Sequence, residues 1–210
     1  MKKTTIWTIV ALVGGYTICQ AIADIGATKL VEIRGVVMPA GTFIFALTFT
    51  LRDLLHKRLG KEWARAAIVM AGLFNVAQAL YLAGMGALPS PGFFGLAEAW
   101  SAVFALVPAI TIGSIAAEVI SEWVDTEIYH VLRHKGPQWL AVLGSNAVSL
   151  PLDSFLFGVL GFWILPKFLG GHAEPFMGAM AIVAGQILWK AIVTIVSLPT
   201  IYLVKDKPII

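Results

Sequence analysis

Long apolar stretches separated by short charged segments dominate this chain. They cover residues 6–23, 36–55, 66–88, 97–132, 139–165 and 177–204. A helix needs about 20 mainly apolar residues to cross the hydrocarbon core of a bilayer. The pattern therefore predicts an all-α integral membrane protein, a six-transmembrane-helix bundle that occupies residues 1–210 as a single domain.

The fourth apolar stretch is too long for one crossing. Pro108 is expected to divide it, because proline removes a helical hydrogen bond and clashes with the preceding turn. Two placements compete. Hydropathy alone prefers a span over residues 97–120, whereas the alternative is a short outer segment up to Leu106 followed by a span over residues 108–132. Only the second placement puts the acidic residues from Glu118 onward inside the membrane.

Composition supports the membrane interpretation and narrows the function. Hydrophobic residues make up 59% of the chain, charged residues 13%, and the mean hydropathy is +0.86, far from the values of soluble domains. The single Cys19 excludes a disulfide framework, and no metal-ligand spacing occurs, so neither a metal nor a cofactor is expected. The net charge of +3 comes from loop residues that form no soluble basic face, which argues against direct nucleic-acid binding.

The distribution of Lys and Arg predicts the orientation. With the N-terminus inside, the outer side receives only Lys29, Arg34 and Lys167. The inner side receives all the other loop cations, namely Lys2, Lys3, Arg52, Lys57, Arg58, Lys61, Arg65, Arg133, Lys135, Lys205 and Lys207. Both termini are therefore expected to be cytoplasmic. The first segment also resembles a cleavable signal peptide, but its loss would invert the charge argument, so its retention as the first helix is favoured.

Polar side chains recur at helical spacing in three of the apolar stretches. Residues three, four and seven apart share one face of a helix. The resulting stripes are Ser114, Glu118, Ser121 or Glu122, Asp125 and Tyr129; then Asn146, Ser149, Asp153 and Phe157; then Gln186, Lys190, Thr194 and Ser197. Serines and amides often only connect helices. Asp153 and Lys190 instead favour a functional site, since ionisable groups at membrane depth are costly.

An internal echo supports a shared polar interior. Ser121-x-x-x-Asp125-x-x-x-Tyr129 is matched by Ser149-x-x-x-Asp153-x-x-x-Phe157, and each segment places a hydroxyl, a carboxylate and a ring on successive turns of one face. Internal repeats are frequent in transporters. Pro151 has no N–H, so it leaves a backbone carbonyl near Ala147 without its helical hydrogen bond. Such a carbonyl is tolerated at membrane depth where it lines a cavity.

Over residues 50–199 the chain resembles the queuosine-precursor transporters, also called the vitamin uptake transporter family. The resemblance is carried by Asp53-Leu-Leu-x-x-x-Leu59-Gly60-x-x-x-Ala64-Arg65, Pro108-x-x-x-x-x-Ser114-x-x-Ala117, Ser121-x-x-x-Asp125, Ser149-x-x-x-Asp153-Ser154-x-x-Phe157, and Lys190 with Pro199. It implies a six-helix, multi-pass protein of the inner (plasma) membrane. It also implies a transporter that imports 7-cyano-7-deazaguanine or its aminomethyl relative for tRNA modification.

A guanine-like ring predicts roles for the polar stripes. Its adjacent N–H donors suit a carboxylate, here Glu118 or Asp153, while its acceptors suit Asn146, Gln186 and Lys190. Stacking is expected from Trp123, Trp189, Phe155 or Phe157. The predicted substrate-binding residues are Glu118, Glu122, Asp125, Asn146, Ser149, Asp153, Gln186, Lys190, Trp123 and Phe157.

Several alternatives remain open at this stage. Import could be proton-coupled or facilitated, or the chain could be the substrate-binding subunit of an energy-coupling-factor complex. Another purine-like or vitamin ligand also fits. Besides the substrate and the lipid bilayer, a homo-oligomeric partner is left open by the small residues at 84–87. An intramembrane serine hydrolase is disfavoured, because the histidines lie at predicted membrane edges, away from Ser114.

Overall fold

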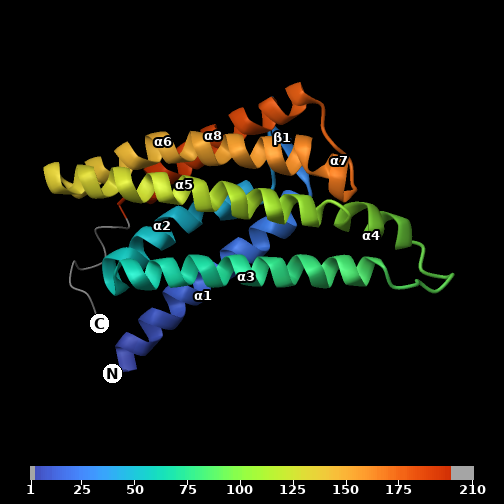
Figure 1. Ribbon diagram of the computed structural model, residues 1–210, viewed down its shortest axis with the longest axis horizontal. Helices are drawn as coiled ribbons and strands as arrows, with labels where there is room; N and C mark the ends of the chain where they lie inside the picture. The colour runs from blue at the N-terminus through green and yellow to red at the C-terminus, as the bar shows by residue number, and fades with distance from the viewer. Residues whose placement is uncertain (1–2, 200–210) are drawn as a thin grey trace.

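The computed structural model describes residues 3–199, and it is an elongated bundle of helices with one small β-hairpin (Figure 1). The end of the sixth apolar stretch, Lys205 and Lys207 lie outside the described residues. The elements in order are α1 (Lys3–Ala27), β1 (Leu30–Ile33), β2 (Val36–Pro39), α2 (Thr42–Leu59), α3 (Lys61–Gly86), α4 (Ala97–Phe104), α5 (Val107–Lys135), α6 (Gln138–Gly158), the π-helical turn η1 (Val159–Ile164), α7 (Pro166–Leu169) and α8 (Phe176–Ser197).

Five helical segments of the described chain are long and apolar enough to cross a membrane. They are Ile6–Ala27, Glu62–Gly86, Ala97–Lys135, Gln138–Leu169 and Phe176–Ser197. The second predicted span is not among them, because the 18 residues of α2 include the charged Arg52, Asp53, Lys57 and Arg58. A multi-pass, mainly helical membrane protein is therefore confirmed, while the sixth crossing stays a prediction.

The fourth apolar stretch is divided as the second placement predicts. The short helix α4 ends at Phe104, and α5 then runs without interruption from Val107 to Lys135. Pro108 lies in the first turn of α5, where its missing N–H costs no helical hydrogen bond. The acidic residues from Glu118 to Asp125 consequently lie in the middle of a long helix.

The hairpin β1–β2 is a departure from the predicted all-α fold. Leu30 to Ile33 pair antiparallel with Val36 to Pro39, and Arg34 and Gly35 turn the chain with positive φ values of 53° and 80°. Such left-handed pairs form the two-residue turns of hairpins. The expectation of one apolar span over residues 36–55 was wrong in its first part, because Val36 and Val37 are β-branched residues of a strand.

Close backbone contacts hold the hairpin and the start of α2 against the bundle. A Cβ on Gly185 of α8 would lie 2.0 Å from the carbonyl oxygen of Val37, and one on Gly41 would lie 2.0 Å from that of Ala23. A side chain at either position would therefore displace the neighbouring backbone. Met38 and Pro39 of the hairpin are buried by this packing.

The bundle has a polar interior and an apolar exterior. Large apolar side chains on α1, α3, α5, α6 and α8 face outward, while five acids and two bases are among the buried residues of the described chain. The beginning of α1, the α2–α3 turn, the α5–α6 turn and the end of α8 lie at one end of the bundle, opposite α4 and α7 (Figure 1). This inside-out distribution fits a protein whose solvent is lipid.

Candidate functional site

Polar faces of five helices converge along the axis of the bundle. The spacing that predicted stripes on α5, α6 and α8 is seen in the structure, and α1 and α2 contribute further polar residues. The buried residues of this polar interior include Tyr16, Gln20, Asp24, Arg52, Ser114, Glu118, Ser121, Glu122, Asp125, Ser149, Asp153, Gln186 and Lys190. Most of them fall into three groups along the axis, while Asp24 and Ser114 line the cavity described below.

The first group is built around Lys190 of α8. Its Nζ lies 2.5 Å from Asp153 Oδ2 on α6 and 3.0 Å from Gln186 Oε1, one turn earlier on α8. The side chains of Lys190 and Asp153 are only 1% and 2% exposed. The ring of Phe45 lies beneath the ammonium group, at 4.9 Å from its centroid. Lys190 thus has the partner that its position in an apolar helix requires.

The second group joins α1 to α5 through Glu118. Tyr16 donates a hydrogen bond to Glu118 Oε1 at 2.5 Å, and Gln20 Nε2 donates to the same oxygen at 2.6 Å. Both of these partners are neutral side chains. Glu118 therefore differs from Asp153, whose partner is a cation.

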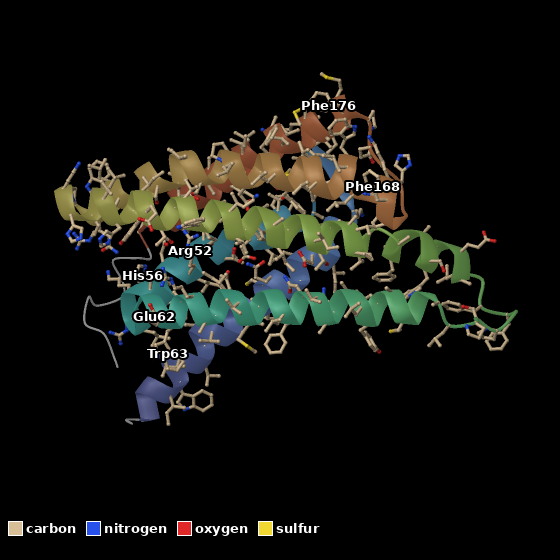
Figure 2. The ribbon with its side chains drawn as sticks, in the orientation of Figure 1. Arg52, His56, Glu62, Trp63, Phe168 and Phe176 are labelled. Carbon is tan, nitrogen blue, oxygen red and sulfur yellow. The ribbon has the colours of Figure 1, made fainter. Side chains whose placement is uncertain are left out.

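The third group is an ion-pair cluster around Arg52 of α2. Arg52 binds Glu122 through Nη1 and Asp125 through Nη2, the latter at 3.0 Å. Ser149 of α6 donates to the other oxygen of Asp125 at 2.8 Å. Figure 2 shows Arg52 between α2 and α5, whereas Glu62 and Trp63 lie at the start of α3. A single cation thereby connects α2 to two acids of α5.

The two halves of the internal echo pair with each other. Ser149 donates to Asp125, and reciprocally Ser121 donates to Asp153 at 3.3 Å. Each hydroxyl thus binds the carboxylate of the other helix. The hypothesis that these segments lie side by side agrees with the extensive packing of α5 against α6.

A small cavity lies beside Lys190. Its volume is about 20 Å³, and it is lined by Ala23, Asp24, Ala27, Pro39, Gly41, Thr42, Phe45, Ser114, Asp153, Phe157, Gln186 and Lys190. The walls come from α1, the hairpin, α2, α5, α6 and α8. The lining contains the carboxylates of Asp24 and Asp153, the ammonium and amide groups of α8, and two aromatic rings.

The structure separates the predicted site residues. Asp153, Phe157, Gln186 and Lys190 line the central cavity. Glu122, Asp125 and Ser149 belong to the cluster around Arg52, and Glu118 binds α1. Asn146 instead lines a groove between α6 and α8, together with Pro151 and Ala147.

Trp123 requires a correction. It is 73% exposed on the outer face of α5, because it follows Glu122 directly and two successive helical residues point about 100° apart. It therefore does not face the polar interior where a stacked ring would lie. Trp189 is packed edge-on against Phe43, with ring centroids 5.1 Å apart, and it is not part of the cavity lining either.

Four residues of the polar interior were missed by the sequence reading. Tyr16, Gln20 and Asp24 lie at i, i+4 and i+8 on α1, a spacing that would have revealed a fourth stripe. Arg52 was counted among the cytoplasmic flanking cations, but it is 6% exposed and paired inside the bundle. Arg52 lies four residues before His56 and five before Lys57, so in the sequence it looks like part of a basic flanking segment.

Comparison with known proteins identifies the family. Residues 39–204 match the family described as "Putative vitamin uptake transporter". A curated protein of Bacillus subtilis (strain 168), named "Probable queuosine precursor transporter", is 28% identical over 200 residues, covering 92% of this chain and 81% of that protein. No solved structure matches the chain. The chain belongs to the vitamin uptake transporter family, and it is a multi-pass membrane transporter rather than an enzyme.

Proposed function

We propose that this protein imports a queuosine precursor, 7-cyano-7-deazaguanine or 7-aminomethyl-7-deazaguanine, across the inner membrane and binds its ring in the central cavity. The observation that carries the proposal is the cavity itself, which ionisable groups of α1, α6 and α8 surround inside an apolar bundle. Transporters place their substrate sites near the middle of the membrane, between helices. The name of the Bacillus relative supports the precursor as substrate.

The small size of the cavity indicates a closed conformation. Its volume of about 20 Å³ compares with about 10–15 Å³ for the space of one water-sized probe. A bicyclic ring therefore requires the walls to move apart.

Charge supports the orientation predicted from the sequence. His56, Lys57, Arg58, Arg133 and Lys135 gather at the end of the bundle where α1 begins and α8 ends. Lys29 lies between α1 and β1, Arg34 lies in the hairpin turn, and Lys167 lies on α7 at the other end of the bundle. An excess of Lys and Arg marks the cytoplasmic side, so this distribution supports cytoplasmic termini, with α2 as the sixth crossing.

A route to the cytoplasm follows from the order of residues along α2 and α5. On α2, Phe45 lines the cavity, Arg52 forms the ion-pair cluster, and His56 lines a pocket of about 250 Å³ at the end assigned to the cytoplasm. On α5, Ser114, Asp125 and Tyr129 follow in the same order. The Arg52 cluster thus separates the cavity from the wider pocket, as an inner gate would.

The excess of acids over bases supports proton coupling. Asp24, Glu118, Glu122, Asp125 and Asp153 are buried in the described chain together with only Arg52 and Lys190. Chains of carboxylates in transporters commonly carry protons. Glu118 can exchange a proton without breaking an ion pair with a cation, since Tyr16 and Gln20 are its partners.

The test measures queuosine in the tRNA of a cell that cannot make the precursor and that carries this gene as its only candidate importer. With low external 7-cyano-7-deazaguanine, queuosine is expected to appear. Its absence, with the protein shown to be in the membrane, would contradict the proposal and favour a vitamin or another purine-like ligand. Queuosine that appears only when an energy-coupling ATPase is present would instead identify a binding subunit.

A further inference from the structure

Two buried polar atoms of the central cavity have no partner of their own. Asp24 of α1 and Gln186 of α8 are 2% and 1% exposed. Among residues 3–199, no group forms a hydrogen bond of good geometry with Asp24 Oδ2 or with Gln186 Nε2, and the hydroxyl groups of Ser114 and Thr111 are the polar neighbours of the Asp24 carboxyl group. Leaving a buried polar group unsatisfied costs about 1–3 kcal/mol. Both side chains line the same cavity, which puts an unused acceptor on one wall and an unused donor on another.

Lys190 fixes which end of the Gln186 amide is available. An ammonium group has three donors and no acceptor, so only the amide oxygen can face it. The contact of 3.0 Å between Lys190 Nζ and Gln186 Oε1 follows this rule. The amide NH₂ is therefore the end that remains for a ligand.

The other acids near the cavity have partners already. Asp153 accepts from Ser121 through Oδ1 and from Lys190 through Oδ2. Glu118 accepts from Tyr16 and Gln20 and is not part of the cavity lining. Binding a ligand through either of these acids would require an existing bond to break, whereas Asp24 Oδ2 can accept at once.

We propose that Asp24 and Gln186 read the hydrogen-bonding edge of the substrate ring, and that they select a guanine-type base over an adenine-type base. This inference rests on the proposed function and names the residues of its specificity. Asp24 accepts the ring and exocyclic N–H groups, and Gln186 donates to the carbonyl oxygen. Phe45 and Phe157, which line the same cavity, face the flat surfaces of the ring.

The selectivity has a simple electrostatic reason. A guanine-type edge presents N–H donors beside a carbonyl acceptor, which complements a carboxylate beside an amide donor. An adenine-type edge presents an unprotonated ring nitrogen at the corresponding position. That nitrogen and a carboxylate are both acceptors, so they repel each other, and the carboxylate would stay unpaired.

The test uses the full-length protein purified in detergent and measures the dissociation constants of two probes, 7-cyano-7-deazaguanine and 7-cyano-7-deazaadenine. Since a hydrogen bond to a charged group contributes about 1.5–3 kcal/mol, the unaltered protein should prefer the guanine-type probe by about 10- to 100-fold. An amide both donates and accepts, as an adenine edge requires. Asp24→Asn should therefore narrow or reverse this preference.

A second variant and a control keep the test decisive. Gln186→Met retains length but removes the donor, and it should weaken binding of the guanine-type probe about 10-fold. Asn75 of α3 is also buried, with both amide atoms unpaired among the described residues, but it does not line the cavity. Asn75→Leu should therefore leave the ratio of the two dissociation constants unchanged.

The outcomes separate this inference from the proposed function. Equal binding of the two probes by the unaltered protein would overturn the inference. An unchanged ratio of the two dissociation constants in a folded Asp24→Asn variant would also overturn it. If that variant does not fold, unchanged binding of the guanine-type probe by Gln186→Met would do the same. In each case import of a precursor could still hold. Failure to bind either probe, with no queuosine in the cell assay, would overturn the proposed function itself.

Discussion

Arg52 and Asp125 form an ion pair between α2 and α5, with Nη2 and Oδ2 3.0 Å apart and both side chains less than 8% exposed. The two helices make few other contacts, because α2 packs mainly against α1, α3 and α8. Glu122, one turn before Asp125, binds the other arm of the same guanidinium group. The Arg52 side chain thus connects α2 to α5 between the central cavity and the wider pocket that His56 and Tyr129 line.

Replacing Arg52 with Gln should destabilise the protein strongly. The change leaves Glu122 and Asp125 buried without a cation, and breaking a buried ion pair by removing one partner costs about 3–5 kcal/mol. Thermal unfolding in detergent should show a lower midpoint. A triple variant in which Glu122, Asp125 and Arg52 are all replaced by neutral residues should regain most of the lost unfolding midpoint.

Arg65 provides the control for this experiment. It pairs with Glu62 at 3.4 Å, but the two side chains are 57% and 83% exposed. Exposed pairs contribute about 0–1 kcal/mol, so Arg65→Gln should hardly change the unfolding midpoint. Equal effects of the two substitutions would contradict the internal role of Arg52.

Asp153→Asn should abolish uptake, because it removes the charge that holds Lys190 at the wall of the cavity. The single variant also leaves a buried cation unpaired and should be unstable. The double variant Asp153→Asn with Lys190→Gln removes both charges, so it should regain thermal stability without regaining uptake of labelled precursor. Uptake retained by a folded Asp153→Asn protein would remove this pair from the mechanism.

The sequence revealed the polar residues of α5, α6 and α8 because ionisable groups stand out in apolar segments. The reciprocal bonds of Ser121 and Ser149 follow from the echo that it contains. The buried position of Arg52 could not be predicted from the sequence, because hydropathy shows that a residue is charged but not whether it has a partner. The hairpin was missed because a short apolar run of β-branched residues cannot be told from the start of a helix by periodicity.

Gly185→Ala should loosen the hairpin from α8, since the new Cβ would lie 2.0 Å from the carbonyl oxygen of Val37. The measurement is labelling of Met38→Cys by a membrane-impermeant maleimide, in a background where Cys19 is replaced by Ala. Met38 is fully buried, so labelling should be low until Gly185 is changed. Gly72→Ala is the control, because no atom lies within 4 Å of the added Cβ, and it should not increase the labelling of Met38→Cys.

Phe157 and Trp123 should differ in their effect on uptake. Phe157 lines the cavity, and stacking of a base on an aromatic ring contributes about 1–3 kcal/mol, so Phe157→Ala should raise the apparent KM about 10-fold or more. Trp123 is 73% exposed on the outer face, and Trp123→Leu should leave the KM unchanged. A larger effect at Trp123 would contradict a substrate site in the central cavity.

Glu118→Gln should uncouple transport from the proton gradient without preventing transport. Glutamine keeps the size of the side chain and an oxygen that can accept from Tyr16, so the contact between α1 and α5 is retained. It cannot carry a proton. In vesicles, accumulation of labelled precursor driven by a pH gradient should be lost, while exchange of internal for external precursor should continue. Because exchange needs the cavity and the inner gate but no net proton movement, loss of both activities would indicate a structural role for Glu118. Retention of both would show that the proton, if one is carried, binds elsewhere.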